Sequence, residues 1–363
     1  MDKVRVLHFE LSENIGGIES FLLNLYSMIN KEKFQFDFVT TAEKAAYGEQ
    51  LKKLGGNIYK VSDYKNVLNY KSDIRNLLKN NYDVVHVHKN SATNIIPLLE
   101  AKRVGGSKII VHSHNTAPSR GRITGGLHKI NQNKLYALAD YHLACSKVAG
   151  KWMYGEKNFE VIRNGIDVAK FIFDENKRRD IREKFGILEN SIVIGNVGRF
   201  TEQKNQMRLL DIFHEIVQCK PDSKILLVGD GPLKKKCKEK ACDLGIDRNV
   251  IFLGNRNDVN DLMQAMDVFV MPSLFEGLPI AAVEAQASGT YLFLSDTISS
   301  EIEISKNVSW FTLNQSDGEI ARMIVKRGVP NESVRLQSNL DVIKSGFAMT
   351  TTSKRMEEIY LSK

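Results

Sequence analysis

Two glutamates, Glu276 and Glu284, stand with seven residues between them and with chain-turning residues beside the first. The apolar run 267–271 predicts a buried strand before them, and the alanine-rich residues 281–287 predict a helix. Glu276 then falls in the strand-to-helix turn, and Glu284 about two turns inside the helix. In an open α/β sheet, such a turn borders the crevice that binds ligands. The alternative is one loop glutamate and one solvated helix glutamate.

The same turn offers backbone donors. Pro279 suits the first helical turn, where a missing N–H costs nothing. The N–H groups of Gly277, Leu278 and Ile280 would have no partner inside the helix and would point at an anion. Two carboxylates would thus flank a site of phosphate size.

A second candidate phosphate site follows the predicted strand 192–198, which ends in glycine. Arg199 and Lys204 lie in the loop after it, and a helix is predicted to start at about Gln203. Glycine lets a ligand approach the backbone, and two cations near a helix start suit a diphosphate. The loop is not a P-loop, because G-x-x-x-x-G-K-[ST] is absent. Alternatively, both cations only serve solubility.

A histidine pair ends the predicted strand 108–112. Because strand residues alternate between faces, His112 and His114 share one side of the sheet. An imidazole at a strand end can take part in catalysis or can be a packed bystander.

Short strands and helices alternate through both halves of the chain, which predicts an α/β protein with parallel sheets covered on both faces. The first unit runs from a strand at 4–9 through Gly16-Gly17 into a helix, and the rhythm restarts at 192. Gly16-Gly17 lacks the full G-x-G-x-x-G, which disfavours a dehydrogenase. The length of 363 residues fits two domains, with the boundary expected at residue 165.

Composition restricts the location. No run approaches the roughly 18 apolar residues of a membrane span. The four cysteines show no C-x-x-C spacing, which indicates reduced, cytoplasmic thiols.

Charge is uneven: residues 1–170 hold 25 Lys+Arg against 16 Asp+Glu, and residues 171–363 hold 26 against 27. The basic half indicates an anionic membrane surface, a phosphorylated acceptor or nucleic acid, unless it only aids solubility. Nucleic acid ranks last, because aromatic residues are not interleaved with the cations. The candidate membrane contacts are Arg120, Arg122, Lys129 and Lys134.

The ordered set of motifs resembles the family 4 glycosyltransferases of the GT-B fold, especially members that assemble bacterial exopolysaccharide or capsule. The resemblance covers nearly the whole chain. Its motifs are Gly16-Gly17, His114, Asn164-Gly165-Ile166-Asp167, Gly198-Arg199 with Lys204-Asn205, Gly229-Asp230-Gly231-Pro232 and Glu276-x7-Glu284.

The resemblance implies two Rossmann-like domains that face each other across a cleft. Residues 1–165 would bind a lipid-linked or saccharide acceptor and residues 166–345 a nucleotide-diphosphate sugar, with UDP as the expected nucleotide. Residues 346–363 would form a helix that crosses back to the first domain. Transfer would retain the anomeric configuration.

The resemblance also assigns roles to residues. His114 and Glu276 would be catalytic, at the reacting face and at the donor sugar. Glu284 would bind the ribose and Arg256 the base. The diphosphate would be held by Gly16, Gly17, Arg199, Lys204, Gly277 and Leu278.

No Asp-x-Asp is present, so no metal or other cofactor is expected. Arg199, Lys204 and the helix start would stabilise the departing diphosphate instead. Two rival functions remain: a GT-B-like nucleotide-sugar epimerase, and a binder without catalysis, against which the presence of Glu276, Arg199 and Lys204 argues.

Overall fold

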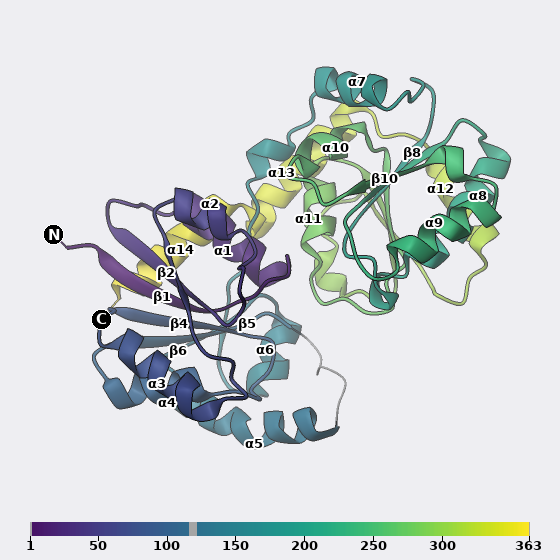
Figure 1. The fold of residues 1–363 in the computed structure, drawn as a ribbon. Helices are drawn as coiled ribbons and strands as arrows, with labels where there is room; N and C mark the ends of the chain where they lie inside the picture. The colour runs from purple at the N-terminus through teal and green to yellow at the C-terminus, as the bar shows by residue number, and fades with distance from the viewer. Residues whose placement is uncertain (1, 116–121, 363) are drawn as a thin grey trace. The chain divides into compact units, whose positions relative to one another are not determined.

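The computed structural model describes residues 2–115 and 122–362 (Figure 1). The chain forms two compact units. Unit 1 comprises Met1–Ile166 together with Ala348–Lys363, and unit 2 is Asp167–Phe347. Each unit is a parallel sheet covered by helices on both faces, so the predicted fold class is confirmed.

Unit 1 holds a seven-stranded sheet in the order β3-β2-β1-β4-β5-β6-β7. Its strands are β1 (Val4–Leu11), β2 (Phe34–Thr40), β3 (Asn57–Lys60), β4 (Val84–Lys89), β5 (Lys108–Ser113), β6 (Tyr141–Ala144) and β7 (Glu160–Val161). Its helices are α1 (Gly17–Met28), α2 (Gly48–Lys53), α3 (Val67–Leu78), α4 (Ile96–Val104), α5 (Arg122–Leu138), α6 (Lys147–Tyr154) and α14 (Met349–Leu361).

Alternation along the strands of unit 1 separates two cores. Leu7, Val85 and Val111 pack on the face covered by α3, α4 and α6. Val6 and Ile110 pack on the opposite face, against α1 and α14. Both faces are buried, as a sheet of βαβ units requires.

The last helix belongs to unit 1. The amide N–H of Met349 donates to the carbonyl of Ile166 at 2.8 Å, where Ile166 and Ala348 form a parallel bridge. A Cβ on Gly165 would lie 2.8 Å from Met349 Cα, so this crossing requires glycine. The chain end is therefore held by backbone pairing as well as by the apolar face of α14.

Unit 2 holds a six-stranded sheet in the order β10-β9-β8-β11-β12-β13. Its strands are β8 (Val193–Val197), β9 (Lys224–Val228), β10 (Val250–Gly254), β11 (Val268–Met271), β12 (Tyr291–Ser295) and β13 (Val308–Phe311). Its helices are α7 (Glu175–Lys184), α8 (Gln206–Cys219), α9 (Lys234–Asp243), α10 (Val259–Ala265), α11 (Ile280–Ala287), α12 (Asp317–Arg327) and α13 (Glu332–Val342).

A buried ionic centre supports unit 2 at the start of β11. The Asp267 carboxylate is fully buried and lies 2.6 Å from Arg178 and 2.6 Å from Arg182, both on α7. Arg335 of α13 approaches it at 3.3 Å, and Val193 of β8 donates its backbone N–H at 2.8 Å. One carboxylate thus joins two helices to two strands.

Across the described residues, no helix combines the length and the apolar character that a membrane span requires. All four cysteines are free thiols.

Candidate active site

In the loop after β8, the side chain of Lys204 lies over Gly198, the residue just before Arg199. A Cβ on Gly198 would lie 3.4 Å from Lys204 Cε, an ordinary van der Waals distance, so the lysine stem crosses directly over this glycine. Arg199 is exposed, whereas the side chain of Lys204 is only 20% exposed. The sequence predicted the two cations but not that Lys204 folds back over Gly198.

Two glycines after β9 allow the neighbouring loop to lie against this turn. Gly229 has φ +131°, and a Cβ there would lie 2.1 Å from the carbonyl oxygen of Gly198. Gly231 would bring a Cβ within 2.5 Å of the Phe200 carbonyl oxygen. The two loops therefore meet backbone to backbone, which leaves peptide groups rather than side chains beside Arg199.

Lys204 and Glu276 form an ion pair, with Nζ and Oε1 2.6 Å apart and the glutamate side chain 11% exposed. Glu276 Oε1 has no hydrogen-bond partner among the described residues, so the contact is mainly electrostatic. Gln203 fixes the approach, because its carbonyl accepts from the Leu274 N–H at 2.8 Å and its amide donates to the Phe275 carbonyl at 3.0 Å. The sequence placed these two residues in one site but did not predict their pairing.

The start of α11 differs slightly from the prediction. The helix begins at Ile280 and Pro279 is its N-cap, with φ −70° and ψ 116°, rather than its first helical residue. In the described part of the chain, no hydrogen bond engages the backbone N–H of Gly277, Leu278 or Ile280. These donors are available to an anion, as predicted.

Glu284 lies about one helical turn after Ile280, the first residue of the helix, and not two turns inside the helix as expected. Its side chain is half-buried. Burial raises the pKa of this carboxyl to about 7. A carboxyl near its midpoint at neutral pH is typical of functional sites, although structural groups shift as well.

Arg256 follows β10 and already has an acidic partner. Its guanidinium forms a two-point ion pair with Asp258, at 2.8 Å from Nε and 2.5 Å from Nη2. This guanidinium holds the pKa of Asp258 below its usual range. Arg256, the arginine expected to bind the base, is thus held by a carboxylate two residues away, and the sequence did not predict this pairing.

In unit 1, Gly16 and Gly17 open α1, with Gly16 as the N-cap. A Cβ on Gly16 would lie 2.9 Å from Glu19 Oε2. Glu19 is buried and accepts hydrogen bonds from both the backbone N–H and the hydroxyl of Ser12, at 3.1 and 2.6 Å. Glu19 therefore fixes the glycine turn, a role that the sequence did not predict.

A second ion pair at the carboxyl ends of the strands was also missed. Glu10, at the end of β1, has φ +79°, and the pairing of β1 with β2 shifts register between His8 and Leu11. Its carboxylate pairs with Lys89, which is 4% exposed at the end of β4. A left-handed glutamate has no sequence signature, because glycine is the usual residue there.

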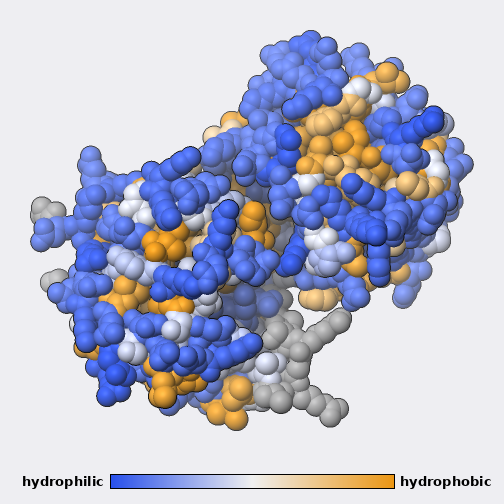
Figure 2. Space-filling view, in the orientation of Figure 1, coloured by the Kyte–Doolittle hydropathy of each residue, from blue (hydrophilic) through white to orange (hydrophobic). Residues whose placement is uncertain are grey.

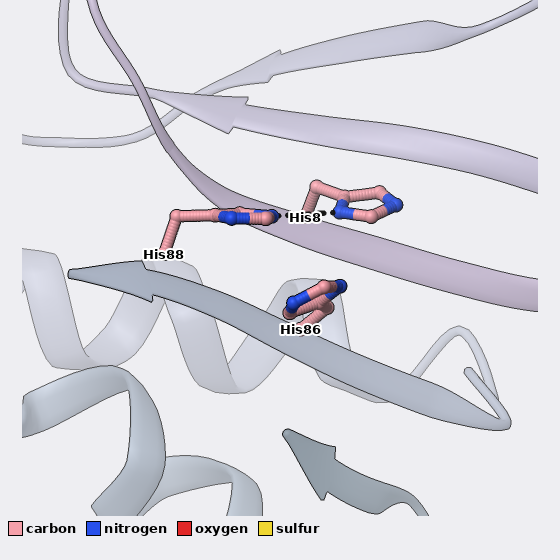
Figure 3. A group of neighbouring side chains, drawn as sticks. All are labelled: His8, His86 and His88. Carbon is pink, nitrogen blue, oxygen red and sulfur yellow. Dashed lines mark hydrogen bonds between the residues drawn. The ribbon is translucent and has the colours of Figure 1, made fainter. Parts of the chain in front are cut away.

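His114 follows β5, and its backbone N–H donates to the Lys89 carbonyl at 2.9 Å. One ring nitrogen lies 2.9 Å from the ring of His88, and burial lowers the pKa of His114 to about 3. The His112 and His114 ring centroids are 4.1 Å apart, as their shared side of the sheet predicted. Three further buried histidines, His8, His86 and His88, complete the cluster (Figure 3).

Two family models match the chain: "Glycosyltransferase Family 4" over residues 15–170, and "Glycosyl transferases group 1" over residues 177–325. The chain is 35% identical to a putative glycosyltransferase of Bacillus subtilis strain 168, EpsF, over 312 residues that cover 82% of this chain and 81% of the relative.

Two further likenesses extend over almost the full length. The Escherichia coli UDP-Gal:alpha-D-GlcNAc-diphosphoundecaprenol alpha-1,3-galactosyltransferase is 26% identical over 384 residues, covering 99% of this chain and 97% of that enzyme. A crystal structure of HepE from Anabaena in complex with UDP superposes with a TM-score of 0.78 at 20% identity, covering 98% of this chain and 99% of that one. The last likeness shows the fold.

Proposed function

The chain belongs to the family 4 glycosyltransferases, and we propose that it moves a hexose or N-acetylhexosamine from a UDP-sugar to a lipid-linked or saccharide acceptor with retention of configuration. The predicted family, GT-B fold and enzyme class, a hexosyltransferase, are confirmed. The E. coli relative uses UDP-Gal and a diphosphoundecaprenol acceptor, which supports UDP and a lipid-linked acceptor. The capsular polysaccharide biosynthesis glycosyltransferase CapH of Staphylococcus aureus is 25% identical to this chain, which supports a place in exopolysaccharide or capsule synthesis.

The observation that carries the proposal is the pairing of a cation with the residue that directly precedes free backbone donors in unit 2. Lys204 contacts Glu276, and Glu276 is followed directly by the unengaged N–H groups of Gly277 and Leu278. A diphosphate bound there gains negative charge as the sugar departs. Fixed dipoles and cations stabilise that charge without reorganising, and each such donor contributes about 3 kcal/mol.

The Lys204–Glu276 pair would change partners when the donor binds. With no donor bound, each neutralises the other. A diphosphate at Lys204 takes over that charge, and the Glu276 carboxylate is then free to accept hydrogen bonds from hydroxyls of the donor sugar. Diphosphate recognition and sugar recognition are thereby coupled through one ion pair.

The remaining roles follow the family resemblance. Glu284 would accept hydrogen bonds from the ribose hydroxyls, and Arg256 would lie at the base. In unit 1, Gly16 and Gly17 would bind the phosphate from the acceptor side, and His114 would act in turnover. We further propose that no metal takes part, since Arg199, Lys204 and the α11 start supply the positive potential.

We also propose a cytoplasmic enzyme that binds the anionic inner face of the membrane, where a lipid-linked acceptor resides. The exposed face of α5 supports this. Leu127 and Ile130 are 43% and 75% exposed there, beside Lys129 and Lys134.

Calorimetric titration of UDP tests the clamp. Charge-assisted hydrogen bonds contribute roughly 1.5–3 kcal/mol each, so Arg199→Ala or Lys204→Ala should weaken UDP binding about tenfold or more. Transfer should slow further, because the leaving phosphate gains charge in the transition state.

Lys240→Ala is the matched control. Lys240 is in the same unit, 23% exposed and paired with Asp211, but on α9. Glu276→Gln should keep or strengthen UDP binding while transfer is lost. If both cation variants bind UDP and GDP like the parent, the clamp is wrong. Donor turnover without any acceptor would instead favour an epimerase.

A further inference from the structure

Five histidines lie on one face of the sheet of unit 1, the face that packs against α1 and α14. They come from β1, β4 and the end of β5: His8, His86, His88, His112 and His114. Three of them form a hydrogen-bonded chain. His8 Nδ1 is 3.1 Å from His88 Nε2, and His88 Nδ1 is 2.9 Å from His114 Nε2 (Figure 3 shows the first link).

The surroundings keep these rings neutral. Phe36 and Phe38 lie 4.4 and 5.5 Å from His8, centroid to centroid, and Phe21 lies 5.5 Å from His114. Burial lowers the pKa of His8 and of His114 to about 3, and holds the pKa of His88 well below its usual value. A neutral imidazole has one N–H and one bare nitrogen.

A chain of three neutral imidazoles permits only two proton arrangements. Either each ring carries its proton on Nδ1, or each carries it on Nε2, because every link needs one donor and one acceptor. The two ends of the chain are His8 Nε2 and His114 Nδ1, and neither has a hydrogen-bond partner among the described residues. The proton on one end therefore decides what the other end offers.

The inner end selects between the arrangements. His8 lies among the rings of Phe36, Phe38 and Tyr360. The two phenylalanine rings offer no donor to a bare nitrogen, and the Tyr360 hydroxyl is already paired with His86, whereas an aromatic ring can accept an N–H weakly. The favoured arrangement places the proton on Nε2 of all three rings and leaves Nδ1 of His114 bare.

We propose that His8 and His88 are positioning residues that hold His114 in its Nε2-protonated tautomer, so that His114 Nδ1 accepts a hydrogen bond from a sugar hydroxyl during transfer. This inference rests on the proposed function for its substrate. It specifies that His114 accepts a hydrogen bond from the substrate and does not donate one. It also gives His8 and His88, two residues in the core, a part in turnover.

A bound cation explains the cluster less well. Ring nitrogens of two groups, His8 with His86 and His88, and His88 with His112 and His114, lie within 4.8 Å of one another. Neither group includes a carboxylate, and the neighbouring rings of Phe21 and Phe36 offer no compensating charge. Burying a divalent charge there would be costly, whereas the neutral chain satisfies four ring nitrogens without it.

Nitrogen-15 NMR of the histidine-labelled enzyme at pH 7, without donor, tests the proton pattern directly. We expect His114 to show a protonated Nε2 and a bare Nδ1. His8→Phe removes the end that selects the arrangement, so His114 should become a mixture of tautomers although the whole His88 ring separates the two sites. His88→Phe should have the same effect and lower kcat about tenfold or more, with UDP affinity unchanged.

His112→Phe is the matched control. His112 is equally buried and its ring is nearer to His114, at 4.1 Å, but it is outside the chain. This variant should keep both the His114 tautomer and kcat. A protonated Nδ1 in the parent enzyme, or a tautomer indifferent to His8→Phe and His88→Phe, would overturn the proposal. An enzyme with the expected nitrogen pattern that transfers no sugar would refute the proposed function and leave the tautomer assignment standing.

Discussion

The carboxyl group of Glu284 should make nucleotide binding depend on pH. Burial raises its pKa from 4.5 to about 7, so the folded protein favours the neutral acid. The associated stabilisation of the fold is complete below the unfolded pKa, near 4.5, and is lost as pH rises through about 7. Ribose hydroxyls donate to a carboxylate, so the ionised form is the one that binds them best.

We therefore expect the affinity for UDP to rise by up to about tenfold between pH 6 and pH 8, as the ionised fraction of a group with a pKa near 7 rises. Calorimetry across this range measures the effect. Glu284→Gln should bind UDP more weakly and lose the part of the pH dependence that comes from the carboxyl group. Titration of the UDP phosphate affects the parent and the variant alike, so the difference between the two profiles reports on Glu284. If the profiles of parent and variant are parallel, Glu284 does not bind the ribose in its ionised form.

The position of a single residue could be predicted where the residue directly follows a predicted strand. Glu276 and the Arg199 loop could be placed at one edge of the sheet because they follow neighbouring parallel strands, β11 and β8. The pairing of Lys204 with Glu276 was not found, because they lie 72 residues apart in sequence and meet through loops. The histidine chain did leave a signal: H-x-H occurs at the ends of both β4 and β5, which places four rings on one face.

At the scale of elements, hydrophobic periodicity located the strands and the helices with an apolar stripe. The strand β5 and the helix α11 match their predicted ranges, 108–112 and 281–287, to within one residue. The helix α7 was missed, because its sequence ENKRRDIREK has almost no apolar residues. It is held by the buried guanidinium groups of Arg178 and Arg182 instead.

Because α7 is held by ion pairs and not by an apolar stripe, the stability of unit 2 should be unusually sensitive to the loss of the Asp267 charge. Asp267→Asn should leave three guanidinium groups buried without a counter-charge and should destabilise unit 2 by about 3–5 kcal/mol. In thermal unfolding, the transition of this unit should fall by about 10 °C. The carbonyl partners of Arg182 and Arg335 would not replace the lost charge.

Asp261→Asn is the control for this change. It breaks a pair between α10 and the same helix α7, Asp261 with Lys177 at 2.8 Å, but one that is exposed. The expected loss is below about 1 kcal/mol. Equal losses from both substitutions would mean that the Asp267 centre does not hold α7 in place.

At the scale of the whole molecule, the two parallel α/β units followed from the alternation of strands and helices. The assignment of α14 to unit 1 could not follow from periodicity, which identifies a helix but not the sheet on which it packs. That contact joins residues far apart in sequence: Tyr360 hydrogen-bonds His86 at 2.8 Å across 274 positions.

Charge is divided between the units. Unit 1 holds 27 Lys+Arg against 17 Asp+Glu, and unit 2 holds 24 against 26. Of the four predicted membrane contacts, Lys129 and Lys134 are exposed on α5, Arg120 lies outside the described residues, and the side chain of Arg122 is not described. Hydrophobic side chains reach the surface at the lower edge of unit 1, near α5 (Figure 2). Cations beside exposed apolar residues are typical of a helix that lies in a membrane interface.

Sedimentation with vesicles tests this proposal. Each cation near an anionic surface contributes about 1 kcal/mol, so Lys129→Ala with Lys134→Ala should weaken binding to anionic vesicles roughly 30-fold. Ile130→Ser should weaken it further and should also reduce the residual binding at high salt, because the apolar contribution is not screened.

The control makes the same change of charge elsewhere. Lys235 and Lys236 are exposed on α9 in unit 2, within a lysine-rich run. Replacing both by alanine removes two charges from the chain, as the α5 pair does, and should leave vesicle binding almost unchanged. If the two double variants bind alike, net charge rather than α5 governs attraction. If the parent binds neutral and anionic vesicles equally, and salt has no effect, then the basic character of unit 1 serves another partner, such as a soluble phosphorylated acceptor.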